Sequence, residues 1–250
     1  MDLGIVIVSY NTAQLTADCL TSVLAELERT QLQAHICVVD NASSDGSAAM
    51  VRERFPQIDL VASDQNLGFA AGTNVGLARL SKLEPHPRYA LLLNPDTIVL
   101  ENAFAHLCDF LDRHPRAGIV GAQLAYGDGS FQHSAFHFPT LPMALFDFWT
   151  INHRLVNSWL NGRYARRLYE GKTPFVVDHP LGASMMVRAE AVADVGLLDE
   201  GFWMYCEEID WCWRMRKQGW RACCVPAAHV IHHAGQSSKQ VGRASCRERV

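Results

Sequence analysis

The stretch GIVIVSY at residues 4–10 decides the fold class together with HICVVDN at residues 35–41. Both are short, β-rich apolar runs that end in polar residues, and the segment 12–29 between them is expected to be a helix. The alternation continues with apolar runs at 58–63, 89–95 and 117–123 and helical segments at 47–54, 70–80 and 101–113. Continuous apolar strands separated by helices predict an α/β, Rossmann-like fold, with a mostly parallel central sheet covered by helices on both faces.

Length and composition limit the kind of protein. The 250 residues, 49% apolar and 19% charged, favour a folded chain with a large core. A net charge of −4, from 22 basic and 26 acidic side chains, argues against a nucleic-acid partner. No apolar run reaches the roughly 18 residues that span a bilayer, and no leader opens the sequence, so we expect a cytoplasmic protein. The eight cysteines lack CxxC or zinc spacing and are expected to be reduced structural thiols.

The second half of the chain is less regular. Residues 126–174 are aromatic and interrupted by proline, and a strand with a short helix returns at 180–200. EEIDWCWRMRKQGW at 207–220 predicts a helix ended by Gly219, and AHVIHH at 228–233 predicts a last strand. We expect one domain over residues 1–240, in two halves (1–120 and 121–240). Residues 241–250 are expected to be a disordered or non-native tail.

Polar residues at strand ends are the first candidates for a binding site, because parallel sheets bind ligands beyond the carboxyl ends of their strands. They are Ser9, Tyr10, Asn11, Asp40, Asn41, Asn94 and Asp96. The Asp40 carboxylate would accept hydrogen bonds from a base or a ribose; the alternative is a turn-forming role. Asp45 is expected to cap the following helix.

The segment NLGFAAGTNVGL at 66–77 adds Asn66, Gly68, Gly72 and Asn74. Its glycines allow the backbone to approach a ligand or to pack closely on a strand. Its amides serve either a ligand or a local turn. The segment is neither a Walker loop nor a dinucleotide GxGxxG motif.

LLLNPDT at 91–97 predicts a metal ligand, because Pro95 presents Asp96 rigidly after a buried strand. Mg²⁺ or Mn²⁺ prefers such oxygen ligands, with substrate phosphates at its other positions. A turn cap is the alternative for Asp96. His232 follows a short apolar run and is either a metal or diphosphate ligand or a structural histidine. His233 is expected on the opposite side of that strand.

The helix at 207–220 carries the candidate base. At about 100° per residue, Glu208 shares a face with Trp211, Cys212 and Met215, whereas Glu207 lies near the Asp210–Arg214 pair. Burial raises the pKa of Glu208 and the helix N-terminus lowers it, a balance that suits a general base.

The order of these motifs resembles family 2 glycosyltransferases of the GT-A fold, close to a bacterial rhamnosyltransferase branch, over about residues 3–238. The resemblance implies that VSYN at 8–11 and Asp40 hold a sugar nucleotide, with 1–120 the donor half and 121–240 the acceptor half. It also implies that Asp96 of the DxD-like Asn94-Pro95-Asp96 binds Mg²⁺ or Mn²⁺, with His232 before a GxS loop. Glu207-Glu208 would match the Glu-Asp motif that supplies the base. Because Asn94 and Glu208 both replace aspartates, Glu207 stays an alternative base.

By this resemblance, the chain would be an inverting, metal-dependent glycosyltransferase of cell-envelope polysaccharide synthesis. It would move a sugar such as rhamnose from a dTDP or UDP donor to a hydroxyl of a glycan or lipid-linked acceptor. The aromatic residues 140–172, with Arg163, Arg166 and Arg167 among them, are either an acceptor lid or a peripheral contact with the inner face of the membrane. The alternatives are a nucleotidyltransferase, which SYNTAQL at 9–15 disfavours, and a non-catalytic nucleotide-sugar-binding module.

Overall fold

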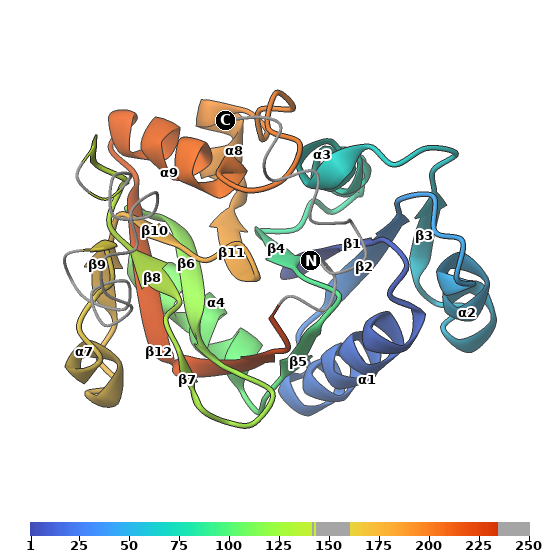
Figure 1. The fold of residues 1–250 in the computed structure, drawn as a ribbon, viewed down its shortest axis with the longest axis horizontal. Helices are drawn as coiled ribbons and strands as arrows, with labels where there is room; N and C mark the ends of the chain where they lie inside the picture. The colour runs from blue at the N-terminus through green and yellow to red at the C-terminus, as the bar shows by residue number, and fades with distance from the viewer. Residues whose placement is uncertain (142, 144–160, 235–250) are drawn as a thin grey trace.

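A computed structural model describes residues 1–141, 143 and 161–234. Its centre is a sheet with the strand order β3-β2-β1-β4-β11-β6-β12-β5 (Figure 1). The first four strands along this order are β3 (Asp59–Ala62), β2 (Ala34–Asp40), β1 (Leu3–Ser9) and β4 (Tyr89–Leu93). All of them are parallel, as predicted, and the register pairs Ser9 with Asp40. The carboxyl ends of β1 and β2 therefore meet at one edge of the sheet.

The other half of the sheet is built from later segments. β11 (Ser184–Arg188) lies antiparallel between β4 and β6 (Ala117–Ala125). β12 (Arg221–His232) runs parallel to β6 and starts seven residues before the predicted strand. Short antiparallel strands complete the sheet: β5 (Thr97–Val99) and β9 (Phe175–Val177) on β12, and β7 (Phe131–Gln132) on β6. β8 (Ala135–Phe136) and β10 (His179–Pro180) form a separate pair.

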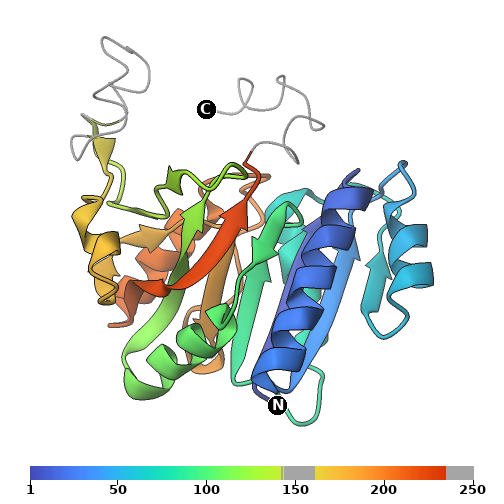
Figure 2. The same cartoon turned by 90° about the horizontal axis from the view of Figure 1, so that it is seen from below.

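Helices cover both faces of the sheet, as expected (Figures 1 and 2). Alternate residues of β1 show this directly: Ile5 and Ile7 pack with one set of helices, and Val6 and Val8 with the other. The first face carries α1 (Ala13–Thr30), α2 (Ser47–Arg54) and α4 (Ala103–Arg113). The second carries α3 (Gly68–Leu80), α8 (Ala189–Val195) and α9 (Glu207–Lys217), and α7 (Arg167–Glu170) is a single turn.

Small residues let α3 approach β1 closely. A Cβ atom on Gly76 would lie 2.4 Å from Val6 Cγ1, and one on Gly72 would lie 3.1 Å from Val8 Cγ1. Both glycines are buried. Of the two roles left open for Gly72, the structure therefore shows packing on a strand.

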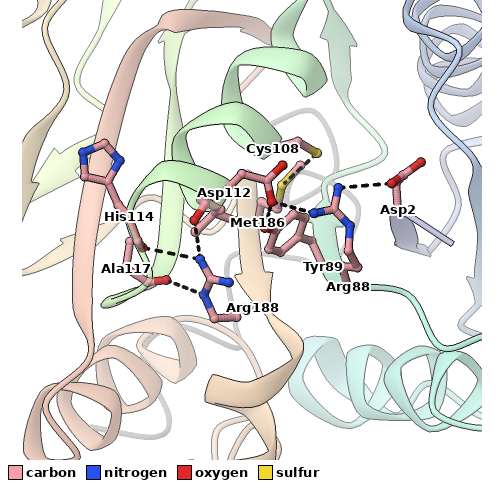
Figure 3. A network of polar contacts seen from close by, with 10 residues as sticks. Asp2, Arg88, Tyr89, Cys108, Asp112, His114, Ala117, Met186 and Arg188 are labelled. Carbon is pink, nitrogen blue, oxygen red and sulfur yellow. Dashed lines mark hydrogen bonds and ion pairs between the residues drawn. The ribbon is translucent and has the colours of Figure 1, made fainter.

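A polar network closes the amino ends of the parallel strands (Figure 3). Arg88 bonds to Asp2 and Asp112, and Arg188 donates to the backbone carbonyls of Leu111, His114 and Ala117. The polar side chains of this network are thus bonded to one another or to backbone carbonyls. Ligand-binding groups are left for the opposite, carboxyl end.

Two further predictions concern the chain as a whole. The seven cysteines in the described part of the chain are free, and six of them are buried. Burial raises the pKa of Cys19 and Cys37 to about 12, which suits unreactive structural thiols. Cys246 and the tail 241–250 lie outside the described residues. Within the residues that are described, no helix is long and apolar enough to cross a bilayer.

Candidate active site

A cavity lies at the carboxyl ends of the parallel strands, where the sequence predicted a site. Its polar lining comes from separate parts of the chain, namely Tyr10, Asn41, Asn66, Asn94, the segment with Tyr205, Glu207 and Glu208, and His232. Lys and Arg are missing from the lining side chains that the structure describes. An anionic ligand in this cavity would therefore need a positive charge from another source.

The loops after β1 and β2 are tied together beside this cavity. Asn11, in the left-handed region with φ of 52°, accepts a hydrogen bond from the Ser44 N–H at 2.7 Å. Asp40 is 3% exposed, and its Oδ2 accepts from the Ser43 N–H at 3.0 Å. Its Oδ1 is buried and has no hydrogen-bond partner among the residues that the structure describes. Asp40 thus forms the predicted turn with one of its two carboxylate oxygens.

Asp45 joins the N-termini of the first two helices. One of its carboxylate oxygens accepts from the Ala13 N–H at 2.9 Å, and the other accepts from the Ser47 N–H at 3.0 Å. The predicted capping role is confirmed, and it extends to α1 as well as α2. The carboxylate fixes both helix starts next to the β1 and β2 loops.

Asn41, which the sequence singled out only as a strand-end residue, organises the segment before α3. Its Nδ2 donates to Asn66 Oδ1 at 3.0 Å and to the Gly68 carbonyl at 2.9 Å. Gly68 has φ of +80°, and a Cβ there would lie 2.6 Å from the Trp203 carbonyl oxygen. That same oxygen accepts from the Phe69 N–H at 2.8 Å. The hydrogen bond from Phe69 to Trp203 therefore holds the start of α3 against the loop that leads to Glu207, and the lack of a side chain at Gly68 makes room for it.

Two predicted binding residues have their side chains in use elsewhere. The Ser9 hydroxyl is fully buried in a cluster with Thr12 and Thr16, at 3.0 and 3.1 Å. Asn74 donates to the Leu198 carbonyl and Glu200, both at 2.9 Å, and accepts from the Leu198 N–H at 3.1 Å. Neither residue lines the cavity. The structure brings Tyr10, Asn66, Gly68 and Asn94 to the cavity, whereas Ser9 and Asn74 support it from behind.

Asp96 and His232 face each other; His232 lines the cavity, whereas Asp96 is buried next to it and is not among the lining residues that the structure describes. Asp96 is 1% exposed, His232 is 7% exposed, and 3.5 Å separates Asp96 Oδ1 from His232 Nε2. The His233 N–H donates to the Asp96 carbonyl at 2.9 Å, which fixes the β12 end on this loop. Gln132, which the sequence analysis missed because β7 has two residues, contacts the second ring nitrogen of His232.

This pair fits a divalent cation by the chemistry of its donors. A carboxylate oxygen and an imidazole nitrogen each bind Mn²⁺-type ions, at about 2.1 Å from the metal. Two ligands at that distance lie at most about 4.2 Å apart, and the observed 3.5 Å is within that limit. The described residues contain no group of three or more candidate ligands. The other positions of the ion would therefore need ligand oxygens such as phosphates.

Glu207 and Glu208 begin α9 and both face the cavity. The prediction that only Glu208 lies on the buried face is wrong, because Glu207 is 5% exposed and lines the cavity too, whereas Glu208 is partly buried. The helix starts at Glu207, so its first turn packs on the cavity wall near Leu181 and Gly182 and not against solvent. The predicted Asp210–Arg214 pair is present at 2.7 Å.

Burial dominates the electrostatics of these two carboxyls. It raises the pKa of Glu207 to about 8, with the Glu208 charge as the second cause. Burial also raises the pKa of Glu208. The Oε2 atom of each residue is buried and has no hydrogen-bond partner within the described part of the chain. The pair can therefore hold a proton near neutral pH and exchange it with a ligand in the cavity.

Comparison with known proteins identifies the family. Residues 4–195 match glycosyl transferase family 2. The chain belongs to this family. This family 2 glycosyltransferase is similar to N-acetylglucosaminyl-diphospho-decaprenol L-rhamnosyltransferase of Mycobacterium tuberculosis. The two sequences are 30% identical over a region that covers 94% of this chain and 77% of the relative. The chain is 29% identical, over 69% of its length, to rhamnosyltransferase WbbL of Escherichia coli, of which it spans 63%.

The fold agrees with the family. The structure of GalNAc-T7 with UDP, GalNAc and Mn²⁺ superimposes with a TM-score of 0.66 at 16% identity, over 93% of this chain and 44% of the other. The predicted GT-A glycosyltransferase fold and the rhamnosyltransferase-like branch are therefore confirmed. The family match ends before Glu207 and His232. The roles of those two residues rest on the geometry of the cavity.

Proposed function

We propose that this family 2 glycosyltransferase moves a sugar, rhamnose in particular, from a nucleoside-diphosphate donor to an acceptor hydroxyl. One observation carries the proposal: one cavity is lined by the His232 ring and by the Glu207–Glu208 pair, and Asp96 Oδ1 lies 3.5 Å from His232 Nε2. The Asp96–His232 pair suits a cation for a diphosphate, and the glutamate pair suits proton removal from an alcohol. The two mycobacterial and enterobacterial relatives named as rhamnosyltransferases support rhamnose as the sugar.

The residues on the donor side would bind the nucleotide. Asp40 Oδ1 would accept a hydrogen bond from the base or the ribose, since none of the described residues bonds to this buried oxygen. Asn94 would donate from its side-chain amide to the donor at the cavity wall. Asp96 and His232 would hold Mg²⁺ or Mn²⁺, and the Mn²⁺ in the GalNAc-T7 structure supports this choice. When bound, the cation supplies positive charge for the leaving diphosphate, which no described lining side chain provides.

Glu208 would act on the acceptor side. Its carboxylate would take the proton of the acceptor hydroxyl while the oxygen attacks the anomeric carbon from the face opposite the diphosphate, which inverts that carbon. A neutral Glu207 beside it would keep a second negative charge away from the reacting oxygen. Its raised pKa of about 8 supports this protonation state at neutral pH.

Substitution of the two glutamates tests this assignment. Glu208→Gln should lower kcat by about 10²- to 10⁴-fold, the usual contribution of a general base. Glu207→Gln, the matched control, should retain transfer. Formation of a rhamnosylated acceptor from dTDP-rhamnose would be followed by mass spectrometry, with UDP-GlcNAc and GDP-mannose as competing donors. Full activity of a folded Glu208→Gln variant would refute the role of Glu208.

Donor hydrolysis separates the alternative functions. A glycosyltransferase slowly releases free sugar and nucleoside diphosphate without an acceptor, whereas a binding module releases neither. A nucleotidyltransferase would release pyrophosphate from a nucleoside triphosphate and a sugar phosphate. Pyrophosphate in that assay, with no sugar release from dTDP-rhamnose, would replace our proposal with the nucleotidyltransferase.

We also propose that residues 140–172 face a lipid-linked acceptor at the inner face of the membrane. Most of this stretch lies outside the described residues, but its basic end is described. The guanidinium groups of Arg163 and Arg166 lie 5.7 and 5.3 Å from the ring centres of Phe136 and Phe131. Basic and aromatic side chains together suit the headgroup region of an anionic membrane. Flotation with liposomes that contain phosphatidylglycerol should carry the protein upward, and its failure to float would leave these residues as an acceptor lid.

A further inference from the structure

Gln132 holds His232 in a way that allows two hydrogen-bonding states. Its Nε2 lies 3.2 Å from His232 Nδ1, and its Oε1 lies 3.3 Å from the same nitrogen. Gln132 is 6% exposed, and His232 is its sole side-chain partner in the described part of the chain. The amide can thus present either its N–H or its carbonyl oxygen to the ring.

Each amide orientation selects a different form of the imidazole. If Gln132 Nε2–H donates to Nδ1, the ring proton sits on Nε2 and is directed at Asp96 Oδ1, 3.5 Å away. If Gln132 Oε1 accepts from Nδ1–H, Nε2 presents a lone pair toward that carboxylate. Two lone pairs facing each other at this distance repel, unless a cation lies between them. In the first orientation His232 can donate a hydrogen bond to Asp96. In the second orientation the Nε2 lone pair can bind a metal ion.

We propose that the Gln132 amide is a two-position switch that sets which nitrogen of His232 carries the proton, and so controls cation affinity at the Asp96–His232 pair. Gln132 is a positioning residue, because it acts through His232 and does not itself reach the ion. The inference rests on the proposed function, in which Asp96 and His232 bind Mg²⁺ or Mn²⁺. The inference adds Gln132 to the residues of the cation site. Gln132 lies outside the strand-end motifs, on the two-residue strand β7.

The local fold suits a switch. β7 is antiparallel to β6 and pairs Gln132 with Leu124, so its backbone is fixed while the side chain turns about its terminal bond. Exchange of the amide oxygen and nitrogen needs no change of volume. The two distances to Nδ1 differ by 0.1 Å, so both orientations fit the same position of the ring.

Two substitutions of Gln132 should change the affinity for the cation in opposite directions. Gln132→Glu supplies an acceptor in both positions, which fixes the proton on Nδ1 and the lone pair on Nε2. Gln132→Met keeps the length of the side chain but removes both hydrogen bonds. Gln123→Glu on the neighbouring strand β6 is the control, because the register pairs Gln123 with His229 and not with His232. Thermal unfolding of all three variants first establishes that each one is folded.

Binding of Mn²⁺ in the presence of dTDP, measured by electron paramagnetic resonance of the free ion, is the main readout. Loss of a partner behind a metal-binding histidine typically weakens metal binding by about 10- to 100-fold, and we expect this of Gln132→Met. Gln132→Glu should bind Mn²⁺ about tenfold more tightly than the wild type. Gln123→Glu should match the wild type.

The proton position on His232 gives a second readout that does not depend on activity. In ¹⁵N-histidine NMR spectra, addition of Mg²⁺ and dTDP should move the wild-type ring to the form protonated on Nδ1. Gln132→Glu should show that form without metal. His232→Gln identifies the signal by its loss.

The outcomes distinguish this inference from the proposed function. Wild-type Mn²⁺ binding together with equal affinities in the two Gln132 variants would overturn the switch alone. Absence of Mn²⁺ binding in the wild type would overturn both the switch and the metal-dependent mechanism. Weaker binding in both Gln132 variants would show that Gln132 only packs against the ring, and this too would overturn the switch.

Discussion

The Glu207–Glu208 pair predicts an unusual pH dependence of stability. Burial, with the charge of Glu208 as a second cause, raises the pKa of Glu207 from 4.5 to about 8. A group whose pKa is higher in the folded state favours folding at low pH, and this contribution is lost as pH rises to the folded value. At 1.36 kcal/mol per pKa unit, a difference of about 3.5 corresponds to about 5 kcal/mol, lost mainly between about pH 4.5 and pH 8.

Glu207→Gln removes this loss, because the amide stays neutral throughout that range. The free energy of unfolding of the wild type should therefore fall more than that of the variant between pH 5 and pH 8.5. Integration between these limits gives a difference of about 4 kcal/mol. Urea unfolding at both pH values, followed by circular dichroism, measures it. Glu53→Gln, on an exposed position of α2, is the matched control and should behave as the wild type.

The same variant tests the division of roles between the two carboxyls. In the proposed mechanism Glu207 is already protonated when Glu208 ionises, so Glu207→Gln leaves the ionisation of Glu208 in place. The acidic limb of the pH profile of kcat/KM should stay at the same pH, with activity retained. Equal pH dependence of stability in wild type and Glu207→Gln would refute the buried, protonated Glu207. Loss of activity by 100-fold or more, about the least expected on loss of a general base, would make Glu207 the base.

Other predictions follow from the packing and from the cation pair. Gly76→Ala should lower the free energy of unfolding in urea by about 1–3 kcal/mol, because its Cβ would lie 2.4 Å from Val6 Cγ1. Gly72→Ala should lower it by less, because its Cβ would lie 3.1 Å from Val8 Cγ1. Equal effects of the two substitutions would contradict the packing argument. Asn74→Ala breaks two buried hydrogen bonds and one part-buried one and should cost about 2–3 kcal/mol without changing the affinity for dTDP; a loss of dTDP binding would restore its predicted donor role. Asp96→Ala should abolish the stimulation of donor hydrolysis by Mn²⁺, and chelation with EDTA should do the same in the wild type; stimulation that survives in Asp96→Ala would place the cation elsewhere.

Much of the fold could be predicted because its first half follows local rules. The helix at 47–54 was predicted with its observed bounds, and the apolar runs from residue 4 to 123 all became strands of the predicted type. The place of β11 between β4 and β6 was not predicted, because strand order depends on contacts between distant segments. The three-residue strand β5 was missed because it is too short to show a periodic pattern.

The site was predictable to the same degree. Asn94 and Glu208 could be placed at strand and helix ends, where local sequence defines the position. Helical periodicity misplaced Glu207, because that argument assumes a helix with a core side and a solvent side. The first turn of α9 faces a cavity instead. Gln132 gave no signal in the sequence, because its importance comes from a contact with His232, 100 residues away.

The central position of β11 has a consequence for biosynthesis. As the chain leaves the ribosome, β4 and β6 are made long before residues 184–188, which must insert between them. Until then, the nascent chain carries two open, apolar sheet borders that attract other strands. Newly made protein should depend on chaperones over this interval. Premature termination before residue 184 should yield aggregated fragments in place of a working donor half.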